Sequence, residues 1–211
     1  MNESRTALGV VTAGALALYG SLAVAQERSY SQEFQVYGGE IFGDRLTETP
    51  ISGSTPRLND TATVGGRYNF NFNDRFGVQL AAGYSPGFTG HVPSGNGDVN
   101  IVQCDLDVVW NIFPDYRFHG YKIVPYAVAG AGYAWALNLD RPIQGAVGAR
   151  AVSIDDSNGY TANAGLGAKY YITDNLFVDF NGRYRYYSRL VNNFGQGMNT
   201  AETSLGVGWH F

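Results

Sequence analysis

The chain has 211 residues, a formal net charge of -4 and 15% charged residues, against roughly 25% in an average soluble protein. The length favours a single domain, and the mild acidity argues against nucleic acid as a partner. Aromatic residues make up 14% of the chain and there are 28 glycines, which suits strands with one face in lipid and the other in a crowded interior. A soluble β-sandwich can have the same composition, so the order of the residues has to decide.

The first 25 residues have the pattern of an export signal. Arg5 precedes an apolar stretch from Thr6 to Leu22, and Ala23-Val24-Ala25 supplies the small-x-small pattern that signal peptidase requires. The stretch is also just long enough for a transmembrane helix, but its glycines favour a cleaved signal. We therefore predict cleavage after Ala25, an exported protein, and one domain over residues 26–211.

From residue 26 onward, polar and apolar residues alternate with period two, which predicts β-strands. The segments with this pattern are Glu33 to Gly43, Thr61 to Phe72, Phe76 to Tyr84, Val102 to Trp110, Ile123 to Leu139, Ala162 to Tyr170, Leu176 to Tyr186 and Glu202 to Phe211. A tilted membrane strand needs about 9–11 residues, whereas strands of soluble domains average about 5–6. The lengths therefore favour strands that cross a membrane.

The alternation also predicts which side chains face lipid. In the first segment we place Tyr37 and Ile41 on the lipid side, which turns Glu40 inward. The later segments place apolar side chains on lipid and put Arg67, the two aspartates 105 and 107, and other charged groups on the opposite, inward face.

The fifth segment has no charged residue between Ile123 and Leu139, and a transmembrane helix is the alternative there. Pro125 and the glycines that follow it fit a strand better, because both are poor residues for a helix interior. In this strand we place Val124, Tyr126 and Val128 on the lipid side.

Short connections alternate with long ones along the chain. Asn73-Asp74 and Asp174-Asn175 are tight turns, while the longer connections lie near residues 43–60, 85–98, 138–158 and 190–199. This asymmetry is typical of outer-membrane barrels. Within lipid every backbone N–H and C=O needs a partner, and only a helix or a closed barrel supplies one. We therefore predict an all-β fold: an eight-stranded antiparallel transmembrane β-barrel with up-and-down topology.

Several local motifs resemble the OmpA-type family of small outer-membrane β-barrel proteins. They are Tyr37-Gly38-Gly39, Pro125-Tyr126 followed by Gly130-Ala131-Gly132, Arg183-Tyr184 and the terminal aromatic residue. The resemblance implies an outer-membrane location, contact with membrane lipid and lipopolysaccharide, and a structural role, with loops available to surface ligands. The alternating ending also resembles the signal read by the barrel-assembly machinery, and its residues are Leu205, Val207, Trp209 and Phe211.

Charged residues of both signs fall on the predicted inward faces. They are Glu40, Arg67, Asp105, Asp107, Lys169, Asp179, Arg183, Arg185 and Glu202. The interior of an eight-stranded barrel is just wide enough for side chains to fill it, and buried charges require partners. We therefore expect a structural ion-pair network, with a gated pore or a proton relay as alternatives.

We predict neither a cofactor nor a metal site. Asp105 and Asp107 together resemble a ligand pair for a hard cation, but the nearby arginines favour ion pairs. The three histidines also lack the spacing of metal ligands.

The region from Arg183 to Ser188, with Gly197-Met198-Asn199, is similar in layout to the lipid A deacylases. In that family a His and a Ser two residues apart on the lipid-facing surface cleave an acyl ester. Here Ser188 takes the serine position but Tyr186 replaces the histidine, and a phenol is a poor general base at neutral pH. We therefore expect a non-enzymatic protein, with an esterase using Ser188 and a narrow solute channel as alternatives.

Overall fold

The computed structural model describes residues 30–43, 57–58, 60–92, 95–137, 143–147, 150–154, 157–188 and 197–211. The predicted export signal lies outside the described residues. The long strands are β1 (Ser31–Phe42), β3 (Thr61–Asn71), β4 (Phe76–Val92), β5 (Gly95–Asn111), β7 (Tyr121–Leu137), β10 (Ser157–Tyr171), β11 (Leu176–Tyr187) and β12 (Met198–His210). The short ones are β2 (Arg57–Leu58), β6 (Arg117–Phe118), β8 (Ile143–Val147) and β9 (Arg150–Ile154).

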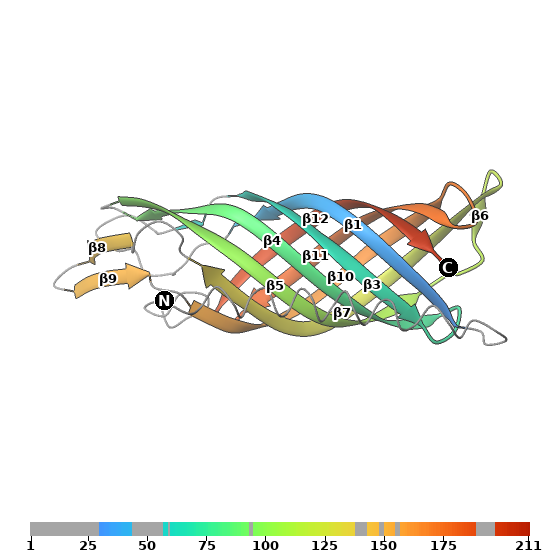
Figure 1. Ribbon diagram of the computed structural model, residues 1–211, viewed down its shortest axis with the longest axis horizontal. Helices are drawn as coiled ribbons and strands as arrows, with labels where there is room; N and C mark the ends of the chain where they lie inside the picture. The colour runs from blue at the N-terminus through green and yellow to red at the C-terminus, as the bar shows by residue number, and fades with distance from the viewer. Residues whose placement is uncertain are drawn as a thin grey trace, which may run out of the picture.

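The eight long strands form a closed antiparallel barrel (Figure 1). Each pairs with its neighbours along the chain, β10 pairs with β7, and β12 pairs with β1 to close the sheet. At the closing seam Gln32 and Phe211 exchange two backbone hydrogen bonds of 2.9 Å. The predicted all-β, eight-stranded, up-and-down barrel is confirmed. Among the described residues, no helix is long and apolar enough to cross a membrane.

The short turns gather at one end of the barrel, which we call the turn end. It contains the turns at Asn73 and Asn175, the small β6–β7 hairpin, and the C-terminal Phe211, while β8 and β9 lie at the opposite end (Figure 1). The β6–β7 hairpin turns through His119 and Gly120, whose φ angles of 50° and 88° match the two positive φ values of a type I′ turn.

The long connections contain more strand than predicted. The segment at 85–98 belongs mostly to a β4–β5 hairpin in which only residues 93–94 are not described as strand, and β10 begins at Ser157 within the connection predicted at 138–158. The register of the β4–β5 hairpin shifts between Ser85 and Phe88, around Pro86. Because proline has no N–H for the ladder, it is tolerated at such an irregularity, and it does not end the strand.

The predicted orientation of β1 is wrong. Tyr37 and Ile41 point inward and are buried, whereas Glu40 is exposed on the outer face. The inward residues of this strand begin with Glu33 and Gln35, so the polar residues that define the inner face lie nearer the turn end than Glu40.

The predicted orientation of β7 is also wrong. Val124, Tyr126 and Val128 point inward and are buried; Val128 and Tyr126 pack with Val109, and Val124 packs with Phe177. Since both faces of this strand are apolar, alternation alone could not distinguish them. The barrel interior is thus partly apolar, and not polar throughout.

Candidate functional site: the charged interior

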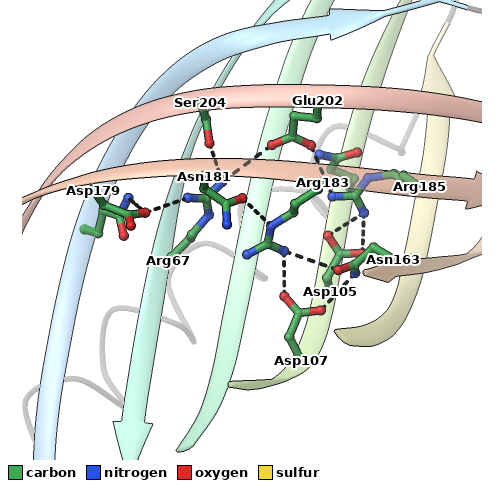
Figure 2. A network of polar contacts seen from close by, with 12 residues as sticks. Arg67, Asp105, Asp107, Asn163, Asp179, Asn181, Arg183, Arg185, Glu202 and Ser204 are labelled. Atoms are coloured by element: carbon green, nitrogen blue, oxygen red, sulfur yellow. Dashed lines mark hydrogen bonds and ion pairs between the residues drawn. The ribbon is translucent and has the colours of Figure 1, made fainter. Parts of the chain in front are cut away.

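Three buried arginines cross the middle of the barrel. Arg67 comes from β3, while Arg183 and Arg185 come from β11, and they are 2%, 3% and 1% exposed. Figure 2 shows their guanidinium groups meeting carboxylates from β5, β11 and β12. Long inward side chains from a tilted sheet of eight strands reach the axis, so contacts form between strands that are not neighbours.

Arg185 makes a two-oxygen contact with Asp105 on β5. Its Nη1 donates to Oδ1 at 2.7 Å and to Oδ2 at 2.6 Å, while its Nη2 lies 3.3 Å from Oε2 of Glu202. Thr161 also donates a hydrogen bond of 2.9 Å to Asp105. The Asp105 carboxylate is therefore held by β10 as well as β11.

Arg183 is held on several sides. Its Nη1 lies 2.7 Å from Oδ2 of Asp107, and its Nε donates to Oδ1 of Asn181 at 2.8 Å. Asn163 donates to the other Asp107 oxygen at 2.9 Å. Charge and hydrogen-bonding capacity are thus both satisfied around this pair, which is the condition under which a buried ion pair is tolerated.

Arg67 connects Asp179 with Glu202. Its Nη1 lies 3.3 Å from Asp179, and its Nη2 lies 3.5 Å from Glu202 and donates to Ser204 at 2.8 Å. The guanidinium carbon lies 3.9 Å from the centroid of the Tyr37 ring, a cation–π geometry. Glu202 is therefore shared between Arg67 and Arg185, which joins the interactions into one network.

Asp179 is fully buried and accepts hydrogen bonds from neutral donors too. Gln35 donates at 2.8 Å, and the Tyr126 hydroxyl lies 2.9 Å and 3.0 Å from the two carboxylate oxygens. Tyr126, predicted to face lipid, thus belongs to the interior network. Its inward position supplies a hydrogen bond that Asp179 would otherwise lack.

A second cluster lies nearer the turn end and centres on Glu33. Lys169 forms an ion pair with this carboxylate, Tyr171 donates to it at 3.0 Å and Asn69 at 3.1 Å. Nδ1 of His210 lies 3.5 Å from the same group, a distance that makes an ion pair when the imidazole is protonated. The cluster connects β1 to β10 and β12 across the closing seam.

Two glycines make room for the carboxylates of β5. Gly130 and Gly132 on β7 stand opposite Asp107 and Asp105 in the register. A Cβ at either glycine would overlap Oδ1 of the facing aspartate and a backbone carbonyl oxygen of β5. The close approach of these side chains to the barrel wall therefore requires glycine at both positions.

The structure brings together all but one of the charged residues predicted for the interior. Glu40 lies on the outer face. The inward carboxylate of β1 is Glu33, which pairs with Lys169. The prediction also missed the neutral partners, among them Asn163 and Asn181. Both lie at inward positions of strands that carry interior charges, and that alternation was the signal that could have identified them.

Asp105 and Asp107, which we expected to form ion pairs with nearby arginines and not to bind a cation, pair with Arg185 and Arg183 of β11. In the described part of the chain, no cluster of histidine, cysteine and acidic residues is arranged to hold a metal ion.

Ser188 follows β11 directly. Its Oγ accepts a hydrogen bond of 3.0 Å from the backbone N–H of Tyr160, and its own N–H donates to the Tyr160 carbonyl at 2.9 Å. Tyr186, at the position of the deacylase histidine, is exposed. The two hydrogen bonds described at Ser188 are thus both with the backbone of Tyr160, whereas a serine nucleophile needs a general base beside its hydroxyl.

The C-terminal residues that resemble an assembly signal all point outward from β12 and its end. They are more than half exposed or close to it: Leu205 59%, Val207 50%, Trp209 52% and Phe211 51%. The inward residues just before them on β12, Glu202 and Ser204, contact the network.

A closed barrel with an apolar outer face and a paired, charged interior defines an outer-membrane β-barrel protein. A family model described as the outer membrane protein beta-barrel domain matches residues 8–211, and the chain belongs to this family. The predicted OmpA-type membership is confirmed. In this class the short turns face the periplasm, so the turn end is the periplasmic end.

Known relatives agree with this class. Outer membrane porin F of Pseudomonas aeruginosa is 25% identical over 209 residues, which are 98% of this chain and 52% of the relative, so the chain spans about half the length of that protein. The attachment invasion locus protein Ail of Yersinia pestis has a TM-score of 0.51 at 16% identity, covering 88% of this chain and 100% of Ail. OprG of Pseudomonas aeruginosa has a TM-score of 0.51 at 14% identity, covering 87% and 98%. The two structures are similar in fold alone.

Proposed function

We propose that the protein is a structural component of the outer membrane whose lumen is closed by its own side chains. The observation that carries the proposal is the network of Arg67, Arg183 and Arg185, which links β3 and β11 to carboxylates of β5 and β12 across the interior. A continuous water column would require several of these contacts to break together. Breaking one buried pair costs about 3–5 kcal/mol, so the closed state is strongly favoured.

Planar-bilayer conductance tests this proposal. We expect the purified protein to leave the bilayer at baseline current, because the paired side chains exclude a continuous water path. The double variant Arg67→Ala, Arg185→Ala removes two of the crossing side chains and should give measurable current steps. A matched control is Arg117→Ala, since this residue is exposed at the periplasmic end and outside the network. Steady, reproducible steps from the unaltered protein would overturn the proposal.

A narrow solute channel is the second candidate, and the relative named outer membrane porin F favours it. If the unaltered protein conducts, substitutions in the network should change its ion selectivity, because the described interior holds five buried carboxylates and four buried basic groups. The same bilayer measurement therefore decides between the two candidates.

Hydrolysis of lipid A through Ser188 is the third function that the sequence suggested, and the hydrogen bonds at that residue do not support it. Release of fatty acid from lipid A by the purified protein, abolished by Ser188→Ala, would establish the esterase and displace the structural role.

The proposal includes the route to the membrane and the partners there. We propose that residues 1–25 are removed on export, which an N-terminus at Gln26 in membrane-purified protein would verify. We also propose that Leu205, Val207, Trp209 and Phe211 present the assembly signal to the barrel-assembly machinery. Lipopolysaccharide and surface ligands would contact the end of the barrel opposite the turn end.

A further inference from the structure

A groove lies on the outside of the barrel at its periplasmic end. It has a volume of about 680 Å³ and runs between the β3–β4 turn and the segment that follows β5. The turn contributes Asp74, Arg75 and Phe76, and the segment contributes Phe113, Asp115 and Tyr116.

The groove continues the lipid-facing surface of the strands. Phe76 is paired in the register with Trp110, and both side chains are exposed on the outer face. Phe113 is 61% exposed and Tyr116 is 48% exposed, although they stand beyond the end of β5. Aromatic side chains at this level are typical of the membrane–water interface, so the groove lies where lipid headgroups meet the protein.

The charged side chains of the groove are exposed and of both signs. Arg75, Asp74 and Asp115 are all exposed, and within the described ranges none of them forms an ion pair. The turn that presents Asp74 and Arg75 is fixed by Asn73, whose side chain accepts hydrogen bonds from the backbone N–H groups of Arg75 and Phe76 at 2.9 Å and 2.8 Å. One cation and two carboxylates thus line the same groove as the exposed aromatic rings.

We propose that this groove binds one phospholipid of the periplasmic leaflet whose headgroup carries both a phosphate and a primary amine. Arg75 would bind the phosphate, because a guanidinium donates two parallel hydrogen bonds to phosphate oxygens. Asp115 and Asp74 would receive the ammonium group. Phe76 and Phe113 would contact the first carbons of the acyl chains.

The charge pattern is what selects this ligand. A headgroup that is only anionic meets two carboxylates with no compensating positive group of its own. A choline headgroup is positively charged but has no N–H to donate to a carboxylate. A headgroup with both a phosphate and a primary amine satisfies Arg75 and the aspartates at once. This binding site is independent of whether the lumen is closed.

Native mass spectrometry of the purified full-length barrel provides the test. The protein is released from micelles containing equal amounts of phosphatidylethanolamine, phosphatidylglycerol and phosphatidylcholine, and the retained lipid is counted. We expect one phosphatidylethanolamine to be retained preferentially. Arg75→Gln should lower its retention roughly tenfold, in line with the loss of a charge-assisted hydrogen bond. Asp115→Asn should lower retention of phosphatidylethanolamine more than that of phosphatidylglycerol.

Arg117→Gln is the matched control, because Arg117 is an exposed arginine of the same periplasmic end that does not line the groove. It should leave lipid retention unchanged. Equal retention of the three lipids, or retention unaffected by Arg75→Gln, would overturn the proposal. A dimer that disappears in Arg75→Gln would assign the groove to a second copy of the chain and would overturn it too. Migration of each variant as a folded barrel on unheated gels checks that folding is intact.

Discussion

At the scale of single residues, the interior depends on small residues as much as on charged ones. Asp107 and Asp105 fit against the wall because Gly130 and Gly132 face them. The sequence showed the aspartates through their alternation with apolar residues. The role of the glycines, which leave space for these side chains, could not be predicted from the sequence. It depends on the register between β5 and β7, which neither strand determines alone.

We expect Gly130→Ala to lower the free energy of unfolding by about 1–3 kcal/mol, since the added carbon overlaps Asp107 and the Leu106 carbonyl. Gly182→Ala is the control: it stands on the outer face with open space around it, and should change stability by less than about 0.5 kcal/mol. Denaturant unfolding in detergent, followed by tryptophan fluorescence, measures both. Equal effects of the two substitutions would mean that space beside the carboxylate does not matter.

At the scale of strands, alternation predicted the existence of every barrel strand but not the orientation of every one. Where one face carries charges, as in β5 and β11, the inward face followed directly from the sequence. In β7 neither face carries a charge from Ile123 onward, and around Tyr126 the inward residues Val124, Tyr126 and Val128 differ from the outward Pro125, Ala127 and Ala129 only in the size of an apolar or aromatic side chain. In this half of the strand the larger side chains lie inside, whereas farther along it Trp135 lies on the outer face and Ala134 and Ala136 lie inside. In β1 we placed the charged Glu40 inward, and this assigned Tyr37 and Ile41 to the wrong face.

The orientation of β7 can be checked with spin labels on a Cys104→Ser background. A label at Ala129→Cys, on the exposed face, should be accessible to oxygen dissolved in the bilayer. A label at Val128→Cys, where the side chain is 3% exposed, should be immobile and protected. The opposite pattern in paramagnetic resonance would show that the strand is turned the other way.

At the scale of the whole molecule, the sequence shows several strands long enough to cross a membrane. In lipid all their backbone N–H and C=O groups must be paired, and a closed barrel meets this requirement. The partners across the lumen do not follow from it, because they depend on strand tilt and stagger as well as on strand order. Thus the charged set was predictable to within one residue, whereas the particular pairs, such as Arg185 with Asp105, required the structure.

Loss of one crossing arginine should weaken the whole barrel. Arg183→Gln leaves Asp107 buried without its cation, and we expect unfolding to become easier by about 3–5 kcal/mol. The measurement is the temperature at which the folded band is lost on SDS gels. Arg117→Gln, an exposed position, should shift this temperature little. A similar shift for both variants would show that the buried pair adds no net stability.

The sharing of Glu202 makes the charge balance of the lumen depend on the last strand. This carboxylate sits on the last strand, yet two of its partners, Arg67 and Arg185, arrive earlier in the chain. Without the final strand, those arginines lack one of their counter-ions. One strand, β12, therefore supplies both the backbone pairing that closes the wall and a carboxylate that two interior arginines share.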